Sequence, residues 1–348
     1  MIKITNICIC GGGALGHTCA AVLSNHKGIE VNMLTNHPEK WQNRFLVHTP
    51  SNETLTGNLT HISHSPKDII PFADIVLLCL PAFLVEETLQ KISPFLSQST
   101  IVGSVVGNSG FFLFAHQILP SQTPLFAFQR VPYISRVINY GQEASLLGYK
   151  EQLLMAVENI SLQNVFCNCI SSLFHTPTCL VDSFYEVTLS NSNPILHTGR
   201  LYTMWKDWNG KDIFHTNPQF YSDWTDEASA LEVKMDEEFF ALLNALDVST
   251  KYIDTLLTHY NATDISSLTK KIKSIPSFAG ILSPMKRVAG GWVPDFCSRY
   301  FTEDFPFGLR FIHDLAHKYH ISCPNIDAVY SWGMQKIQHS INNYSTHL

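Results

Sequence analysis

A glycine-rich turn near Met1 restricts the fold more than any other feature of the sequence. Three glycines with the G-x-G-x-x-G spacing follow an apolar run over residues 4–10 and precede a helix-like stretch ending near Leu23. In such a turn the first glycine bends the chain, the second admits a pyrophosphate and the third lets helix and strand pack closely. The helix N-terminus then offers free N–H groups to the phosphates. A purely structural turn is the alternative, but we expect a dinucleotide site. The residues expected to contact the dinucleotide are Gly11, Gly13, Ala14, Leu15 and Gly16.

The end of the second predicted strand, over residues 28–35, determines which nicotinamide cofactor we expect. An acidic residue at this place normally holds the ribose hydroxyls of NAD. Here the strand ends at Thr35 and Asn36, and Arg44 follows shortly afterwards. Donors and positive charge suit the 2′-phosphate of NADP, although the nearby Glu39 opposes this interpretation. We therefore expect NADP(H) to be favoured over NAD(H), with Thr35, Asn36 and Arg44 contacting the cofactor.

The hydrophobic pattern of the N-terminal half predicts an α/β fold with a Rossmann-type doubly wound sheet. Residues 73–80 form an apolar run apart from Asp74, as in parallel strands that are covered on both faces. Open α/β sheets bind ligands beyond the carboxyl ends of their strands. We therefore expect Leu80 and Pro81 at the cofactor, and Asn108, after the next strand, at the substrate. Further predicted elements are a helix over residues 83–92, strands over 100–106, 125–128, 137–140 and 144–148, and a hairpin or edge strands over 52–65.

Helical patterns replace the helix–strand alternation after about Val181. Candidate helices cover residues 194–205, 227–246, 250–260, 305–319 and 325–340. The sequence therefore predicts a dinucleotide-binding Rossmann domain over residues 1–182 and a mostly α-helical substrate and catalytic domain over residues 183–348.

Composition excludes several classes of partner. The chain of 348 residues has a formal charge of −6, so it presents no basic field for nucleic acid. Its longest mainly apolar stretch, residues 73–85, contains an aspartate and a proline and is too short to cross a bilayer. Because the first predicted strand begins close to Met1, we expect no signal peptide. Cys167 and Cys169 have neither a zinc nor a redox spacing. We expect a cytoplasmic, metal-free protein that acts alone or as a homodimer.

Several segments together resemble the opine dehydrogenases, the octopine and nopaline dehydrogenase family. The most specific are Asn191-Ser-Asn-Pro-Ile-Leu-His197 and Arg299-Tyr-Phe-Thr-Glu-Asp304. The likeness covers nearly the whole chain and includes the glycine turn, Cys79-Leu-Pro-Ala-Phe83, Gly107-Asn-Ser-Gly110 and Val131-Pro-Tyr133.

This resemblance implies an NAD(P)H-dependent reductive condensation. An amino acid and a 2-oxo acid would form an imine, which hydride reduces to a secondary amine dicarboxylate. By the same resemblance, His197 and Asp304 match the catalytic pair of the family. Arg299 matches the arginine that grips a substrate carboxylate.

The chemistry of such a reaction calls for the same residue types. Hydride addition to C=O or C=N makes the oxygen or nitrogen basic, and histidine is a natural proton donor near pH 7. A carboxylate behind the imidazole fixes its tautomer and favours its charged form. A guanidinium grips a carboxylate with two parallel hydrogen bonds.

Other interpretations of these residues stay open at this level. His197 is one of 16 histidines, and Asp304 is also placed to stabilise the start of a helix. Glu303 competes with Asp304 for either role. Arg200 is either an alternative carboxylate grip or a solvated helix residue, and Tyr133 either contacts the amino acid substrate or packs in the core.

Two other kinds of protein would have the same predicted architecture. A ketopantoate-reductase-like enzyme would reduce a 2-oxo acid without an amine and would rely on a catalytic lysine. A nicotinamide-binding sensor would bind the cofactor without turnover, and it would have no need of His197, Asp304 and Arg299 together.

Overall fold

The computed structural model describes residues 3–345, apart from the side chains of Ser109 and of residues 340–345. The chain divides into two compact units, Met1–Ser190 and Asn191–Leu348, called here the N-terminal and C-terminal units. The boundary falls after Ser190 rather than after residue 182, because the short helix α5 (Tyr185–Thr188) packs against elements of the N-terminal unit. None of the helices in the described part of the chain is both long and apolar enough to span a membrane.

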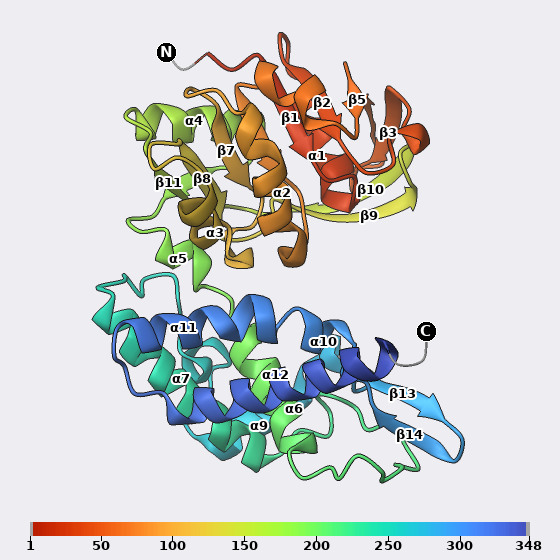
Figure 1. Ribbon diagram of the computed structural model, residues 1–348, viewed down its shortest axis with the longest axis vertical. Helices are drawn as coiled ribbons and strands as arrows, with labels where there is room; N and C mark the ends of the chain where they lie inside the picture. Colours follow the sequence, from red (N-terminus) through yellow and green to blue (C-terminus); the bar gives the residue numbers. More distant parts are fainter. Residues whose placement is uncertain (1–2, 346–348) are drawn as a thin grey trace. The chain divides into compact units, whose positions relative to one another are not determined.

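The N-terminal unit is built on an eight-stranded sheet, which confirms the predicted doubly wound fold (Figure 1). The strand order is β12-β11-β8-β7-β6-β1-β2-β5. β1, which is apolar after Asn6, lies inside the sheet and pairs in parallel with β2 and β6 on its two sides. The chain therefore reverses its winding direction beside β1, which is where such sheets bind ligands. The strands are β1 (Asn6–Cys10), β2 (Glu30–Leu34), β5 (Ile62–Ser63), β6 (Ile75–Leu78), β7 (Ile101–Ser104), β8 (Leu125–Phe128), β11 (Leu153–Glu158) and β12 (Thr178–Leu180).

A second sheet of four strands packs on α1 (Ala14–Ser24), the helix that follows the glycine turn. Its order is β4-β3-β10-β9, and its strands are β3 (Arg44–His48), β4 (Thr54–Asn58), β9 (Tyr133–Asn139) and β10 (Glu143–Tyr149). The prediction of a hairpin over residues 52–65 is wrong, since β4 and β5 belong to different sheets. The alternative prediction of edge strands is confirmed, because each of the two is the last strand of its sheet.

Three longer helices complete the N-terminal unit: α2 (Val85–Ile92), α3 (Phe111–Ile118) and α4 (Gln163–Leu173). The sequence predicted the first of them. It did not predict α3 or α4.

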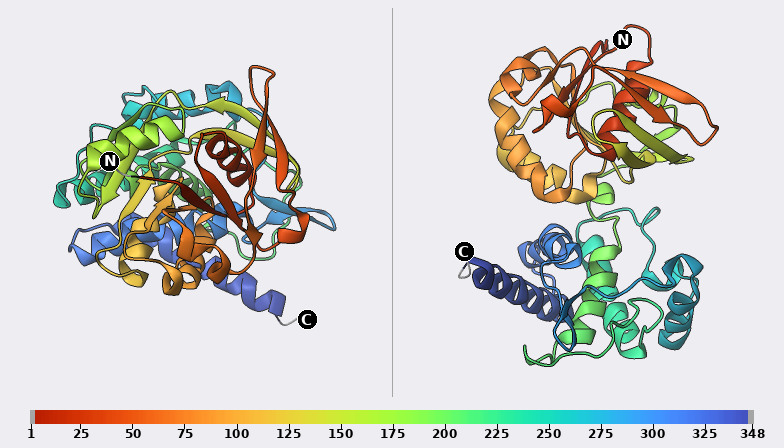
Figure 2. Two further views of the ribbon diagram at one scale, coloured as in Figure 1. Left: turned by 90° about the horizontal axis from the view of Figure 1, so that it is seen from above. Right: turned by 90° about the vertical axis from the view of Figure 1, so that its right-hand side faces the viewer.

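The C-terminal unit is organised around α6 (Asn193–Trp205), which packs against α7 (Asp226–Ala245) and α12 (Pro324–Ser345). In Figures 1 and 2, α6 runs through the middle of this unit and α12 lies along one side. Thr225 starts α7 by accepting the N–H of Ala228 with its hydroxyl oxygen. The other elements are α8 (Leu256–His259), α9 (Ile265–Ser274), α10 (Arg299–Thr302), α11 (Arg310–Lys318), β13 (Met285–Val288) and β14 (Gly291–Pro294).

Two predicted helices of the C-terminal unit differ from the structure. The stretch 250–260 is helical only from Leu256, because the Thr255 side chain caps the helix there. The stretch 305–319 divides into a π-helical turn, η8 (Phe305–Leu309), and α11. In this turn the N–H of Leu309 donates to the carbonyl of Asp304, five residues earlier.

Candidate active site

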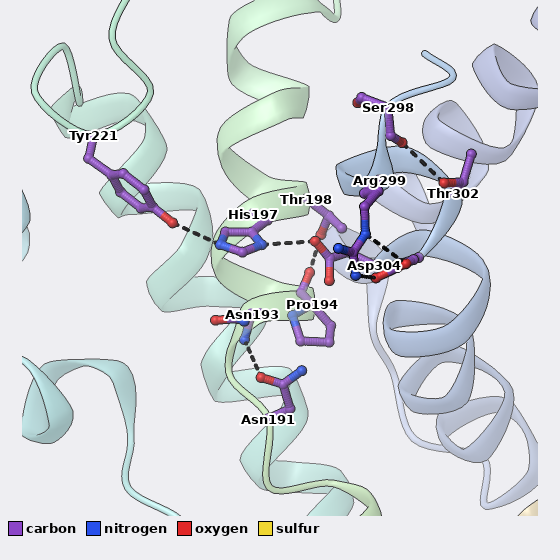
Figure 3. Close-up of polar contacts among 11 residues, drawn as sticks. Asn191, Asn193, Pro194, His197, Thr198, Tyr221, Ser298, Arg299, Thr302 and Asp304 are labelled. Carbon is purple, nitrogen blue, oxygen red and sulfur yellow. Dashed lines mark hydrogen bonds and ion pairs between the residues drawn. The ribbon is translucent and has the colours of Figure 1, made fainter. Parts of the chain in front are cut away.

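His197 and Asp304 are hydrogen-bonded to each other although 107 positions separate them in the sequence. His197 lies at the end of the first turn of α6, and Asp304 immediately precedes η8. The imidazole Nδ1 is 2.8 Å from Asp304 Oδ2 (Figure 3). Both side chains are largely buried, with 12% and 19% of their surfaces exposed. Glu303, the competing acid, bonds to Arg299 instead.

The contacts of the imidazole define its tautomer. A carboxylate oxygen only accepts, so Nδ1 carries a hydrogen and Nε2 of the neutral ring accepts. The Tyr221 hydroxyl lies 2.9 Å from Nε2 and donates to it in that state. Burial, and next the neighbouring Tyr300, raise the pKa of Tyr221, so its hydroxyl keeps its proton. His197 is therefore held between an acceptor and a donor, with the ring in one orientation.

A glycine allows the two segments that carry this pair to approach each other. Gly308 in η8 faces Pro194 in the first turn of α6. A Cβ atom at Gly308 would lie 2.6 Å from Pro194 Cγ, which is closer than real side chains come. The backbone of η8 therefore packs directly on α6, and this contact brings Asp304 to His197.

Arg200 supports the segment that carries Tyr221. Its side chain is buried, with Nε donating to the carbonyl of Phe220 and Nη2 to that of Asp223. The nearby Glu232 is completely buried, and its oxygens have no hydrogen-bond partner among the described residues. Burial raises the pKa of Glu232, while the charge of Arg200 opposes this. Arg200 is thus neither solvated nor free to grip a substrate, which corrects both predictions for it.

Arg299 lies beside the pair but is already engaged. Its Nε and Nη2 donate to the two carboxylate oxygens of Glu303, at 2.9 and 2.8 Å. Its side chain is 81% exposed, and Figure 3 shows it close to Asp304. A substrate carboxylate would have to replace Glu303 or use the remaining donors of the guanidinium. The substrate role of Arg299 stays a prediction.

Two other predicted substrate residues belong to the N-terminal unit. Tyr133 is completely buried in the core, and its hydroxyl donates to the carbonyl of Phe174. The prediction that it contacts substrate is wrong for this reason, and the core alternative holds. Asn108 is half-buried in the turn after β7, at the carboxyl edge of the sheet, and its role stays a prediction.

A cavity of about 580 Å³ lies over the glycine turn, within the N-terminal unit. The ends of β1, β2 and β6 and one face of α2 line it. Six residues predicted to bind cofactor contribute to the lining, namely Gly11, Gly13, Thr35, Asn36, Leu80 and Pro81. The cavity thus occupies the switch point of the sheet.

The glycines of this turn have distinct environments. A Cβ at Gly16 would lie 1.9 Å from the carbonyl oxygen of Gly11, so this residue permits the close packing of α1 on the turn. A Cβ at Gly13 would meet nothing within 4 Å, and this residue lines the cavity. The first turn of α1 contains no acidic side chain. Open space beside free helix N–H groups fits the pyrophosphate of a dinucleotide.

The side chain of His17 holds the glycine turn in place through two hydrogen bonds. Its Nε2 accepts the backbone N–H of Gly141 at 2.8 Å, so Nδ1 carries the hydrogen and donates to the carbonyl of Gly13 at 2.9 Å. The ring is completely buried, and burial lowers its pKa. A neutral histidine thus ties the second glycine of the turn to the four-stranded sheet.

The remaining cofactor predictions have mixed outcomes. Arg44 is exposed on β3 and does not line the cavity, so the structure does not support its contact with a 2′-phosphate. Ala14, Leu15 and Gly16 form the first turn of α1 outside the cavity lining. Contact between their backbone N–H groups and a phosphate stays a prediction.

Comparisons with known proteins agree with this arrangement. The family model described as NAD/NADP octopine/nopaline dehydrogenase, alpha-helical domain, matches residues 180–337. Octopine dehydrogenase of Mizuhopecten yessoensis is 26% identical over 95% of this chain and 90% of its own. The C-terminal unit thus matches the octopine/nopaline dehydrogenase model, and the whole chain is similar to opine dehydrogenases. A second family model, that of ketopantoate reductase PanE/ApbA, matches residues 7–106.

Two further opine dehydrogenase relatives extend the likeness over nearly the whole chain. Tauropine dehydrogenase of Arabella iricolor is 27% identical over 94% of this chain and 90% of its own. The solved structure of octopine dehydrogenase with NADH and L-arginine shares the fold, with a TM-score of 0.85 and 23% identity. That similarity covers 96% of this chain and 90% of the other.

Sequence reasoning missed two residues of the site, Tyr221 and His17. Tyr221 stands outside the segments that resemble the family, and only folding brings it to His197. His17 follows the third glycine directly, so its position one turn after Gly13 in a helix was the available signal.

Replacing Gly13 with valine tests the cavity as the nucleotide site. The backbone at Gly13 is extended, and its Cβ direction is open, so the Gly13→Val chain should fold. The valine side chain would occupy the space of the pyrophosphate, and we expect NADPH binding to be lost. Fluorescence titration with NADPH measures this, and circular dichroism checks the fold. The control Gly148→Ala, on β10, should bind normally, whereas normal NADPH affinity in folded Gly13→Val would contradict the assignment.

Proposed function

We propose that this protein catalyses the reductive condensation of an amino acid with a 2-oxo acid. The product is a secondary amine dicarboxylate, and one reduced nicotinamide and one proton are consumed as one water is released. The observation that carries the proposal is the buried contact between His197 and Asp304 in a chain that also holds a dinucleotide cavity.

The glycine turn would hold the cofactor. Open space at Gly13 and the N–H groups of α1 suit the pyrophosphate, and Leu80 and Pro81 line the cavity after β6. A bound reduced nicotinamide would supply the hydride. The protein itself supplies the positioning of substrates and the transfer of the proton.

His197 would give the proton that the substrate needs. The ring would first take up at Nε2 the one proton that the reaction consumes. Reduction of C=N places basic character on the nitrogen, which would take this proton from Nε2 of the charged imidazole. Asp304 accepts from Nδ1 throughout, so it keeps the ring oriented and stabilises its charged form. Substrate would take the place of the Tyr221 hydroxyl at Nε2.

Arg299 and Asn108 are the proposed contacts to the substrates. The guanidinium of Arg299 is exposed and has the geometry to bind a carboxylate in exchange for Glu303. The relatives include octopine and tauropine dehydrogenases, and one solved octopine dehydrogenase structure contains L-arginine. These names describe those proteins. For this chain we propose the substrate classes, an amino acid and a 2-oxo acid.

A simple 2-oxo acid reductase is the second candidate, because residues 7–106 match the ketopantoate reductase model. This match covers the nucleotide-binding region, which both kinds of enzyme need. The C-terminal unit, which matches the octopine/nopaline dehydrogenase model, carries the histidine–aspartate pair. We therefore favour the condensation.

The requirement for an amine separates these functions. We expect NADPH oxidation with pyruvate, glyoxylate or 2-oxoglutarate to depend on an added amino acid from a broad panel, with absorbance at the nicotinamide band as the measurement. Equal rates without any amine would indicate a simple reductase. Binding of NADPH with no oxidation across the panel would indicate a sensor without turnover. Either result would contradict the proposal.

We also propose that NADPH is preferred to NADH. No acidic side chain occupies positions 35–37, and His37, His64 and Lys91 line the cavity, although Glu87 pairs with Lys91. An acid would repel a 2′-phosphate, and its absence leaves room for the phosphate.

An aspartate at Asn36 should reverse this preference. We expect Asn36→Asp to lower the ratio of kcat/KM for NADPH over NADH by about tenfold or more, because like charges in contact cost several kcal/mol. The control Asn58→Asp adds the same charge to an exposed position outside the cavity lining and should leave the ratio unchanged. A wild-type enzyme that clearly prefers NADH would show that the preference was misjudged.

A further inference from the structure

Three potential metal ligands converge where α11 meets the start of α12. His313 and His317 are one turn apart on α11, and Asp327 lies in the first turn of α12. Asp327 Oδ1 lies 3.5 Å from Nε2 of His313 and 2.8 Å from Nε2 of His317. A ligand atom from each of the three residues lies within 4.8 Å of the other two. Two imidazole nitrogens thus approach one carboxylate oxygen at the surface of the C-terminal unit.

We propose that His313, His317 and Asp327 bind one divalent transition-metal ion, with Zn²⁺ the best match. Zinc ligands at about 2.0–2.1 Å in a tetrahedron lie roughly 3.3 Å from one another. The separations of 3.5 and 2.8 Å are close to this value, so small side-chain rotations would complete the site. Two imidazoles favour zinc-like ions over Mg²⁺ and Ca²⁺, which prefer oxygen ligands. Water would take the fourth position.

The surroundings of the three ligands are those of a metal site. Asp314 Oδ1 accepts from Nδ1 of His313 at 2.8 Å, which fixes the tautomer that leaves Nε2 free for a metal. The buried Cys323 thiol donates to Asp327 Oδ1 at 3.3 Å and orients that carboxylate. The Tyr330 ring packs against His313, with centroids 4.2 Å apart. Only His317 is mostly exposed, and it leaves a path for the ion.

An ordinary ion pair accounts for only part of this arrangement. The contact between His317 and Asp327 would satisfy both groups on its own. It does not explain why the second imidazole points Nε2 at the same oxygen while a separate carboxylate holds its Nδ1. The expectation of a metal-free protein rested on cysteine spacing, and it overlooked two histidines four positions apart with an aspartate ten positions further on.

Such an ion would join α11 to α12 across the turn between them. α11 directly continues η8, the segment that follows Asp304. Because the ligands lie on two helices, binding should stabilise the folded C-terminal unit and raise its unfolding temperature.

Titration of the purified full chain, with any affinity tag removed and metals stripped by a chelator, tests the site. We expect isothermal titration calorimetry to show one Zn²⁺ per chain, and Co²⁺ to give the visible absorption of a tetrahedral site. The midpoint of thermal unfolding should rise with Zn²⁺ and not with Mg²⁺. The absence of Zn²⁺ binding would overturn the proposal.

Variants locate the binding. His317→Ala and Asp327→Asn should weaken Zn²⁺ binding by about 100-fold or more, and Asp314→Asn, one step removed, by roughly 10- to 100-fold. The control is His116→Ala, which removes a histidine paired with one carboxylate, Glu158, at 2.6 Å and should change nothing. His317 is 57% exposed, so its loss should not unfold the chain, and unchanged NADPH affinity checks this. Binding that persists in both His317→Ala and Asp327→Asn would overturn the proposal.

Discussion

The proton transfer that we propose for this protein depends on the hydrogen bond between His197 and Asp304. Its two partners come from separate segments, and a direct backbone approach brings those segments together. Gly308 packs on Pro194 without a side chain between them, and the π-helical turn begins directly after Asp304. Short π-helical segments cost stability and are frequent at functional sites. The geometry of η8 therefore helps to hold the Asp304 carboxylate at His197.

The surroundings of this pair hold the imidazole in a defined state. Tyr221 occupies Nε2, and Arg200 holds the backbone on both sides of Tyr221 through two carbonyl groups. The charge of Arg200 is itself buried, beside a carboxylate that lacks hydrogen-bond partners among the described residues. A similar principle operates in the N-terminal unit, where neutral His17 fixes the carbonyl of Gly13. In both units, buried polar residues hold the groups that we propose to contact ligands.

The sequence predicted those features that short-range patterns encode. The glycine turn has a fixed spacing and a fixed mechanical role, so the strand, the turn and the cofactor cavity could all be predicted from it. His197 and Asp304 were identified through segments that resemble a family, and the contact between them required the folded chain. Contacts between residues that are distant in the sequence could not be predicted from it. Tyr133 was misassigned because an exposed and a buried tyrosine look alike in sequence, and Arg44 because its strand belongs to the second sheet.

A double-mutant cycle on His197 and Asp304 determines whether the two residues act together in catalysis, as we propose. General acid–base catalysis contributes about 10²- to 10⁴-fold, so His197→Ala should lower kcat by roughly that factor while NADPH affinity is retained. Asp304→Asn should lose somewhat less, because it disturbs only the tautomer and charge of the ring. If the two residues act as a unit, the double variant should be barely slower than His197→Ala. The proposal would be contradicted if the reductions in kcat of the two single variants multiply in the double variant. A His197→Ala enzyme with normal kcat would also contradict it.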